Sequence, residues 1–561
     1  MQGVESVDRE FWDAAEVVGH LVPAGSMFAF LAEHRGAVFP DQDYADLFAP
    51  GRGRPSIPAT RMAAVLTLQA LHELSDRECA EAVRCDLRWK VACGLSLLDE
   101  GFDPSTLVYW RKRIAKSERP YRINDAVRQV IEATGVLAGR RRRAVDSTIL
   151  DDAVATQDTV TQLISAIRRV GRQVPGAAEV IAAERTAHDY RDPGKPRIDW
   201  TDPGAQQELV SALVTDAHTL LAAVGAQQAE QGERDEAAET AVALLALVAG
   251  QDVEPAEGSD GSDGRWRIAR RVAPERVIST VDPDARHTRK SPSRRRDGYR
   301  AHVVADPDTG LITDEALTKA AGPDNADAAV AAEFLAATSA ASATAGENPA
   351  GENPAGDEPG SRDPARSSEQ DSGQGEALTW YADSAYGTGE LRDAIEQAGH
   401  HARIKPKPLT SAVEGGFTRD DFAVDEDAGT VTCPAGQTRP VTATRTVSFG
   451  ARCRDCPLRA RCTTSKSGRM LVLHERDDLL RAARAQWAAD PAVGEDYRQH
   501  RPHIERTVSQ VASRGGRRVK LRYRGTAKNH AWLTCRTAAL NLRTLIGQRL
   551  ARRNGTWALA T

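Results

Sequence analysis

The sequence predicts an α/β protein in which a mixed sheet flanked by helices follows an all-helical N-terminal domain. Three observations lead to this prediction. Apolar residues recur at helical spacing through residues 8–135, a β-branched apolar run stands at 144–150, and strand-like and helix-like segments alternate from residue 299 onward. At 561 residues the chain is also too long for one typical domain, so we expect about two to four.

The formal net charge of −5 averages over unlike segments. From Arg501 to Arg553 the chain carries 14 Lys or Arg residues and a single acid, Glu505, whereas 226–264 and 346–376 are acidic. Because local charge decides what a surface attracts, the basic C-terminal region predicts a polyanionic partner. The sequence shows no run of about 18 apolar residues and no secretory signal pattern, so we expect a cytoplasmic protein with reduced thiols.

The N-terminal domain, residues 1–135, is expected to contain successive short helices. The first covers 56–74, and the second covers 75–95 and begins at Ser75, which forms an S-x-x-E capping box with Glu78. A third follows the Asp103-Pro104 helix-start signal and carries a basic run. This arrangement suggests a helix-turn-helix-like DNA reader, although a helical bundle with a solvated basic face fits these features equally well. The basic run is Arg111, Lys112 and Arg113.

The catalytic domain is predicted to comprise residues 140–155 and 265–550, interrupted by insertions. Residues 156–264 are expected to form a helical insertion that ends in a polar linker at 251–264. Residues 340–376 are rich in Ala, Gly, Ser, Glu and Pro and cannot bury enough apolar surface to fold, so we expect a disordered insertion.

The predicted elements of this domain occur in the order strand, hairpin, helix, strand, helix, strand, helix. That order is the one found in an RNase H-like core, in which the first strand lies beside the strand after the hairpin and helix. We therefore expect Asp146 and Asp383 to be neighbours despite their distance in the sequence. The expected segments are 144–150, the hairpin 299–317, a helix from Asn325, and then 378–386, 388–397, 401–405, a helix that Glu505 opens, and a last helix at 529–549.

Three acids stand in settings that suit a metal site. Asp146 lies within an apolar strand, where a carboxylate must be paired or bind a metal. Asp383 follows a strand, although it could instead cap the next helix, and Glu505 lies beside an apolar helical stripe, although it could simply pair with Arg501 or Arg506. Two carboxylates on strands and one on a helix are what a two-metal phosphoryl-transfer centre needs, because Mg²⁺ prefers a few oxygen ligands.

Residues 425–470 contain four cysteines with the spacing C-x19-C-x2-C-x5-C. The central Cys-x-x-Cys provides half of a tetrahedral site, and the outer two cysteines could complete it. We expect a structural zinc knuckle, with incidental free cysteines as the alternative. The four are Cys433, Cys453, Cys456 and Cys462.

Several motifs in order make the chain resemble bacterial insertion-sequence transposases of the DDE superfamily. The likeness covers most of the chain except 340–376 and much of 156–264. The motifs are GRGRP at 51–55, LSDRE at 74–78, VDST at 145–148, DGYRAH at 297–302, ADSAYG at 382–387, IERT at 504–507 and RYRG at 522–525.

The resemblance implies that Asp146, Asp383 and Glu505 hold two Mg²⁺ (or Mn²⁺) ions that catalyse DNA cleavage at the element ends and strand transfer. It also implies double-stranded DNA partners, namely terminal inverted repeats and target DNA, a synaptic homodimer, and a place at the bacterial nucleoid. One alternative is a decayed or domesticated transposase that binds DNA without catalysis, and another is a nuclease acting on RNA–DNA hybrids. The expected DNA-binding residues are Arg111, Lys112, Arg113, Arg300, Arg506, Lys520, Arg522 and Arg524.

Overall fold

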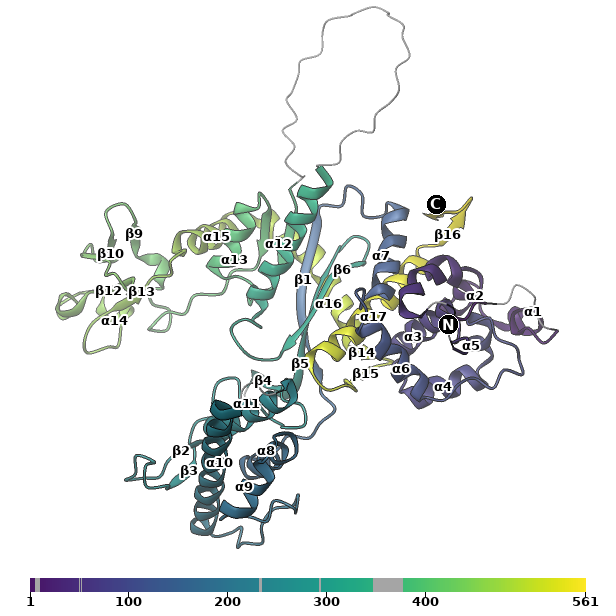
Figure 1. The fold of residues 1–561 in the computed structure, drawn as a ribbon. Helices are drawn as coiled ribbons and strands as arrows, with labels where there is room; N and C mark the ends of the chain where they lie inside the picture. The colour runs from purple at the N-terminus through teal and green to yellow at the C-terminus, as the bar shows by residue number, and fades with distance from the viewer. Residues whose placement is uncertain are drawn as a thin grey trace, which may run out of the picture.

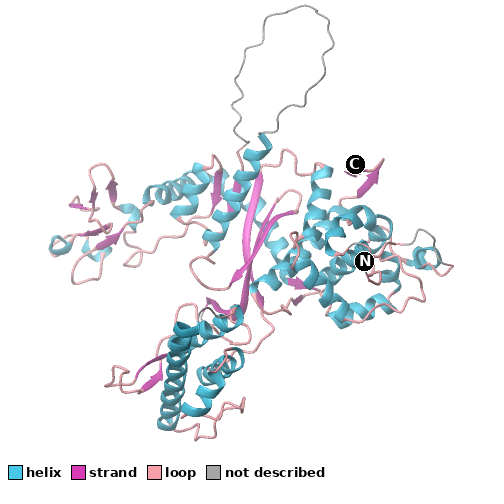
Figure 2. Ribbon diagram, in the orientation of Figure 1, coloured by secondary structure: helices cyan, strands magenta, loops and turns pink. Residues whose placement is uncertain are grey.

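The computed structural model describes residues 1–5, 11–49, 51, 53–231, 235–291, 294–346 and 377–560. Most of the insertion expected to be disordered, from 347 to 376, lies outside these residues, whereas the expectation is wrong at 340–346, which form the end of a helix. A central sheet joins an N-terminal helical domain, a helical insertion and a small cysteine-rich lobe (Figure 1). The long strands lie in the centre and helices dominate the N-terminal domain and the insertion (Figure 2).

The central sheet is mixed, and this confirms the predicted α/β class. Its strand order is β4-β5-β1-β7-β8, with β6 also paired to β5. Strand β1 is antiparallel to β5 and parallel to β7, and β7 is parallel to β8. The sequence did not predict β4, because its residues are mostly basic. The strands are β1 (Arg142–Asp151), β4 (Arg286–Ser291), β5 (Arg294–Ala305), β6 (Ile312–Lys319), β7 (Thr379–Ala382) and β8 (His401–Ile404).

Helices cover both faces of this sheet. Side chains alternate along β1, so Val145 packs on the face of α12 (Asp327–Gly346) and α13 (Gly389–Gln397). The preceding residue, Ala144, packs on the opposite face, against α16 (Pro491–Ala512) and α17 (Thr526–Gly547). The face toward α16 is also the face of Asp146, two residues further along the strand.

The N-terminal domain contains seven α-helices among its described residues. The predicted capping box is confirmed, because the Ser75 backbone N–H donates to Glu78 (2.7 Å) and the Glu78 N–H donates to the Ser75 hydroxyl (3.2 Å). The single helix expected after Ser75 is wrong, since Asp86 ends it and caps a new helix by accepting from the Arg88 N–H (2.9 Å). The helices are α1 (Ala14–Val18), α2 (Met27–Val38), α3 (Ala59–His72), α4 (Asp76–Cys85), α5 (Leu87–Ala92), α6 (Ser105–Ala115) and α7 (Arg122–Thr134).

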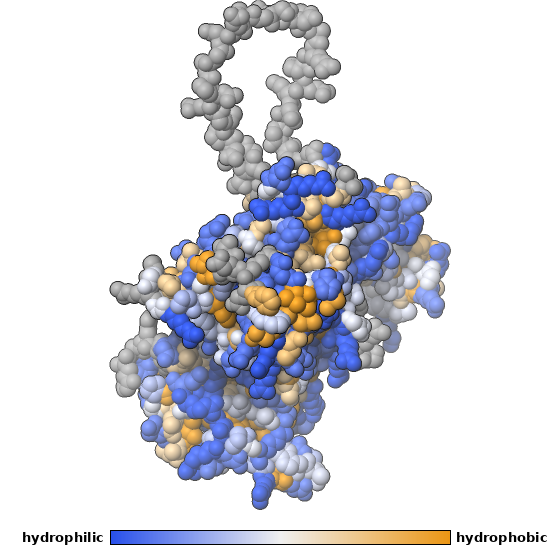
Figure 3. All heavy atoms as spheres, turned by 90° about the vertical axis from the view of Figure 1, so that its right-hand side faces the viewer, coloured by the Kyte–Doolittle hydropathy of each residue, from blue (hydrophilic) through white to orange (hydrophobic). Residues whose placement is uncertain are grey.

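One face of the molecule, seen in Figure 3, mixes polar and apolar residues. Several large apolar side chains of the N-terminal domain remain exposed, including Phe11, Leu21 and Leu98. Scattered exposed apolar residues are normal on a protein surface.

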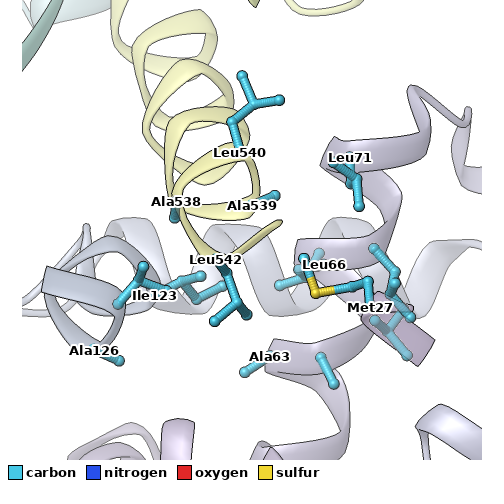
Figure 4. Packing of buried hydrophobic residues seen from close by; sticks show 14 of the residues in the cluster. Met27, Ala63, Leu66, Leu71, Ile123, Ala126, Ala538, Ala539, Leu540 and Leu542 are labelled. Carbon is cyan, nitrogen blue, oxygen red and sulfur yellow. The ribbon is translucent and has the colours of Figure 1, made fainter. Parts of the chain in front are cut away.

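Helix α17 lies at the centre of a core that the N-terminal helices and the sheet share. Its residues Ala538, Ala539 and Leu542 pack among side chains of α2, α3 and α7 (Figure 4). The same apolar cluster continues to Ile504 on α16 and Ala144 on β1. The chain's two ends are therefore held in one hydrophobic core.

The insertion has its own core, formed by α8 (Thr159–Gln173), α9 (Ala177–Glu184), α10 (Pro203–Gln231) and α11 (Glu236–Gln251). The expected polar linker at 251–264 is wrong in part, because β2 (Val253–Pro255) pairs with β3 (Trp266–Ile268). Trp266, beyond the predicted linker, anchors this hairpin by packing on the insertion core.

One helix among the described residues, 203–229 within α10, is long and apolar enough to cross a membrane. Its residues Leu213 and Leu220 are buried in the insertion core. We therefore interpret it as a core helix.

The remaining elements form the cysteine-rich lobe, one helix beside it, and two C-terminal hairpins. The lobe has an apolar centre that includes Phe422, Val431 and Phe449. The lobe contains β9 (Ala423–Asp425), β10 (Thr430–Thr432), β11 (Thr438–Pro440), β12 (Thr446–Ser448), α14 (Arg459–Cys462) and β13 (Met470–Val472). The helix beside it is α15 (Asp477–Ala489). The two hairpins are formed by β14 (Ser513–Arg514) with β15 (Arg517–Arg518) and by β16 (Leu550–Arg553) with β17 (Thr556–Leu559).

Helix α17 also covers the edge strand β6. The Asn541 side chain accepts the backbone N–H of Ile312 (2.8 Å) and donates to the Ile312 carbonyl (2.8 Å). Asn541 is only 2% exposed, so no water replaces these bonds easily. A buried side chain thus takes the place that a neighbouring strand would occupy.

We predict that Asn541→Leu lowers the free energy of unfolding by roughly 2–6 kcal/mol, because two buried backbone groups each lose a partner at roughly 1–3 kcal/mol. Urea denaturation of the full chain measures this loss. The exposed Lys528→Ala on the same helix is the control, and a loss no larger than that of the control would contradict the prediction.

Candidate active site

The candidate site begins where two parallel strands lie side by side. Asp146 is in β1, and Asp383 directly follows β7. Ala144 pairs with Tyr381, so two residues further along each strand Asp146 stands opposite Asp383. The Asp383 carboxylate accepts the Ala385 N–H (2.8 Å) as the chain turns toward α13. The two aspartates are therefore neighbours, as the predicted strand order required.

Helix α16 brings Glu505 and a buried arginine to the same place. Arg501 Nη2 lies 2.9 Å from Asp146 Oδ2, and Arg501 Nη1 lies 3.5 Å from Glu505 Oε1. The Arg501 side chain is 5% exposed, the Asp146 side chain 16% and the Glu505 side chain 64%. The sequence suggested Arg501 only as an alternative partner of Glu505, whereas the structure pairs it with acids on two elements.

The charges of the three acids act on the pKa values of their neighbours in the site. Burial raises the pKa of Asp146, Arg501 opposes that shift, and the negative charge of Asp383 adds to it. Burial also raises the pKa of Tyr497, and the charges of Asp383, Glu505 and Asp146 all act in the same direction. All three acids therefore act on one small region, and the single charge of Arg501 does not balance them.

Helix α16 is longer than expected, and Glu505 lies in its second half instead of opening it. The sequence signal was hidden by Pro502, an unusual residue inside a helix because it removes one backbone hydrogen bond. The predicted apolar stripe of Ile504, Val508 and Val511 is confirmed as buried. Glu505 points beside this stripe and stays exposed.

The N-terminal half of α16 is fixed to the sheet by Asp496. The Tyr381 hydroxyl donates to both Asp496 carboxylate oxygens at 3.0 Å, and Arg403 lies 3.4 Å from the same carboxylate. These contacts set the height of α16 above the ends of β7 and β8, and so the position of Arg501.

The opposite face of the sheet holds a separate polar network. Asp327 at the start of α12 accepts from the Ser147 hydroxyl (2.6 Å) and pairs with Arg300 (3.0 Å). His302 is fully buried beside them, within hydrogen-bonding distance of Thr318 (3.1 Å), and burial lowers its pKa. Arg300, expected to contact DNA, is therefore committed to an internal ion pair.

The other expected DNA-binding residues divide into two groups. Arg111 pairs with Asp76 (2.5 Å) and lies over the Tyr523 ring, while Arg113 lies over the Phe48 and Tyr109 rings. The exposed group is Lys112, Arg506, Lys520, Arg522 and Arg524, although Arg522 also donates to the Glu73 carbonyl (2.8 Å).

The four cysteines of the lobe line one small cavity: Cys433, Cys453, Cys456 and Cys462. The Cys433 and Cys453 sulfurs accept backbone N–H groups from Gln437 (3.4 Å) and Arg469 (3.5 Å). Burial raises the pKa of Cys462, and the other three sulfurs add to that shift. In the described part of the chain, no group of three or more His, Cys, Asp or Glu side chains has the geometry of a metal site as the side chains stand.

Two family models match the chain. One, described as "Transposase DDE domain", matches residues 432–546, which include Arg501, Glu505 and the four cysteines of the lobe. The other, described as "Transposase domain (DUF772)", matches residues 17–113 in the N-terminal helices. Neither range contains Asp146 or Asp383. No curated protein and no solved structure matches the chain. Both family descriptions agree with the motifs in the sequence, and together they support an insertion-sequence DDE transposase.

Proposed function

We propose that this transposase cuts DNA at the ends of its element and joins the freed 3′ ends to target DNA by two-metal phosphoryl transfer. Asp146, Asp383 and Glu505 are the proposed catalytic residues. The observation that carries this proposal is that the buried guanidinium of Arg501 pairs with Asp146 of β1 and Glu505 of α16, while Asp383, directly after β7, lies beside Asp146.

The topology supports an RNase H-like core. Strands β6, β5 and β1 are antiparallel neighbours, and β7 and β8 continue the sheet parallel to β1. That is the strand order inferred from the sequence for such a core. It brings β1, which carries Asp146, together with β7, which Asp383 directly follows.

The residues fit divalent metal ions by their chemistry. Asp146, Asp383 and Glu505 would hold Mg²⁺ or Mn²⁺, because these ions prefer carboxylate oxygens and retain waters for a substrate phosphate. Burial raises the pKa of Asp146 and the nearby charge of Asp383 adds to that shift, so a bound cation would stabilise the ionised carboxylates. Bound there, the ions would supply activation of the attacking oxygen and stabilisation of the leaving oxygen.

The protein's own groups have distinct tasks. The sheet fixes Asp146 and Asp383, since β1 is paired on both sides. Glu505 is exposed and can adjust its side chain toward the substrate. Arg501 keeps Asp146 and Glu505 together, and its planar guanidinium suits a phosphate oxygen once a metal replaces it as the counter-ion.

The proposed partners are double-stranded terminal inverted repeats and target DNA, held by a synaptic homodimer. Family membership implies DNA as the partner. The 14 basic residues between Arg501 and Arg553 support this, since phosphate neutralisation supplies much of the affinity for DNA.

We also propose that the cysteine-rich lobe binds one structural Zn²⁺ ion. Four thiols around one cavity, two of them accepting backbone N–H groups, fit the donor set of a Cys₄ site. The lobe is small, and a metal would add to the stability of its short strands.

For catalysis, we predict that purified protein with Mg²⁺ cleaves labelled duplex DNA carrying the ends of its element. Asp146→Asn should lower the cleavage rate at least about 10²-fold, as loss of one preorganised electrostatic contact does elsewhere. The control is Asp314→Asn, another partly exposed strand aspartate on β6. Binding without cleavage by the unmodified protein would instead identify a decayed or domesticated DNA-binding protein.

For Arg501, we predict that Arg501→Ala destabilises the metal-free protein by about 3 kcal/mol, because Asp146 loses its buried counter-ion. Added Mg²⁺ should then raise the melting temperature of the variant more than that of the unmodified protein. Arg506→Ala, exposed on the same helix, is the control. Equal Mg²⁺ responses in all three proteins would show that no cation takes the place of the guanidinium.

For the lobe, we predict about one zinc per chain by elemental analysis of protein purified without added metal. Cys456→Ser should abolish the zinc and lower the melting temperature, whereas Cys85→Ser, an exposed cysteine outside the lobe, should change neither. Zinc-free unmodified protein with an intact fold would eliminate the proposed site.

A further inference from the structure

Three segments that are far apart in the sequence form one open groove. It is lined by Ser75 and Asp76 at the start of α4, by Ala153 just beyond β1, and by the C-terminal segment 518–523. We call it the junction groove. In Figure 1, β14 and β15, which lead into this segment, lie between the N-terminal helices and the insertion. Its volume is about 580 Å³ and it is open to solvent.

The C-terminal segment presents a row of positive charges to this groove. Val519 and Leu521 are each 1% exposed, so their side chains face the protein. The alternate residues Arg518, Lys520 and Arg522 are exposed and line the groove. Alternate residues of an extended chain are about 6.6 Å apart, so the row is about 13 Å long. A DNA strand has one phosphate per about 3.4 Å of helix axis, so the row matches roughly four nucleotides.

Three acids near this row pair with basic residues of the protein itself, whereas a fourth, Asp152, is 5% exposed and has a carboxylate oxygen without a hydrogen-bond partner. Asp76 pairs with Arg111 (2.5 Å), and Asp151 pairs with Arg296 (2.7 Å). Glu73 forms an ion pair with Arg522, whose Nε lies 3.7 Å from the Glu73 carboxylate. Within the described ranges, Arg518 and Lys520 form no ion pair, so their charges face the groove.

The groove and the candidate active site share one edge of β1. Strand β7 pairs with this edge at residues 142–144, which places Asp383 opposite Asp146. Further along this edge, the C-terminal segment pairs with β1 through its backbone. Lys520 forms a parallel β-bridge with Asp151, and the Leu521 N–H donates to the Asp151 carbonyl (2.8 Å). Five residues separate Asp146 from Asp151, and at about 3.3 Å per residue this is roughly 16 Å. That length corresponds to about five base pairs of DNA.

We propose that the junction groove holds the sugar–phosphate backbone of double-stranded DNA about five base pairs from the cleaved phosphate, with Arg518 and Lys520 contacting phosphates. This inference rests on the proposed function, since it places the substrate of that site. The row of charges reads no bases, so it fixes the register of the duplex without selecting its sequence.

The test compares duplex binding by the full chain, by Arg518→Ala/Lys520→Ala, and by a matched pair, Arg172→Ala/Lys466→Ala, whose side chains are exposed outside the basic C-terminal region. Fluorescence anisotropy with a labelled element-end duplex is measured in EDTA over a range of NaCl concentrations, so cleavage plays no part. The groove variant should reduce the slope of log K against log salt by about 1.8, or about 0.9 per lost phosphate contact. The matched pair should leave the slope unchanged, and all three proteins should melt at the same temperature.

The outcomes separate this inference from the proposed function. Equal slopes for the two double variants would overturn the groove assignment while leaving the proposed function intact. Failure of the unmodified protein to bind the duplex would overturn both. If the groove variant lost as much affinity for a polyglutamate peptide as for the duplex, the assignment to a DNA backbone would be overturned. Phosphate-ethylation interference supplies a second readout, and interference about five base pairs from the cut, lost in the groove variant alone, is the expected result.

Discussion

The architecture depends on one buried guanidinium, that of Arg536 on α17. It is 2% exposed and donates to the carbonyls of Ala70 and Leu71 at the end of α3, at 2.7 and 3.0 Å. It also donates to the carbonyls of Gln510 and Ser513 at the end of α16, at 2.9 and 3.1 Å. Carbonyl groups at helix C-termini lack intrahelical partners and carry partial negative charge, so one cation satisfies two helix ends. The N-terminal domain and the helix of the candidate site are thereby fastened to the same residue.

This contact explains how α16 can hold the residues of the candidate site in place despite Pro502. The proline removes a hydrogen bond next to Arg501, which weakens the helix where precision matters most. Asp496 fixes the helix on one side of that weak point through Tyr381, and Arg536 fixes it on the other. The backbone that carries Arg501 and Glu505 is therefore held by tertiary contacts at both ends, and helix propensity has little part in it.

The sequence predicted those features that local pattern determines. The polar Asp146 inside an apolar strand, together with the order of strands, led to Asp383 as its neighbour, and the register of β1 and β7 agrees. The double pairing of Arg501 could not be predicted, because Asp146 and Glu505 are 359 residues apart in the chain and only the packing of α16 on β1 brings them together. Charge alone also failed to distinguish Arg111 and Arg300, which pair internally, from Lys520, which faces solvent. The metal ligands remain predictions, since they depend on side-chain movement around Arg501.

Along one edge of β1, some basic residues are paired with acids inside the protein and others are exposed, so the two kinds can have different roles. Near Asp146 the positive charge is buried and matched to carboxylates, so it can hold acids together but cannot attract a distant polyanion. Near Asp151 the carboxylate is paired with Arg296, and the exposed charges of Arg518 and Lys520 are in excess. Exposed charges act over about a Debye length and are sensitive to salt, whereas buried ones are not. Under the proposed function, attraction of a nucleic acid and positioning of the reacting phosphate would belong to different residues, and salt should weaken the first while leaving the second intact.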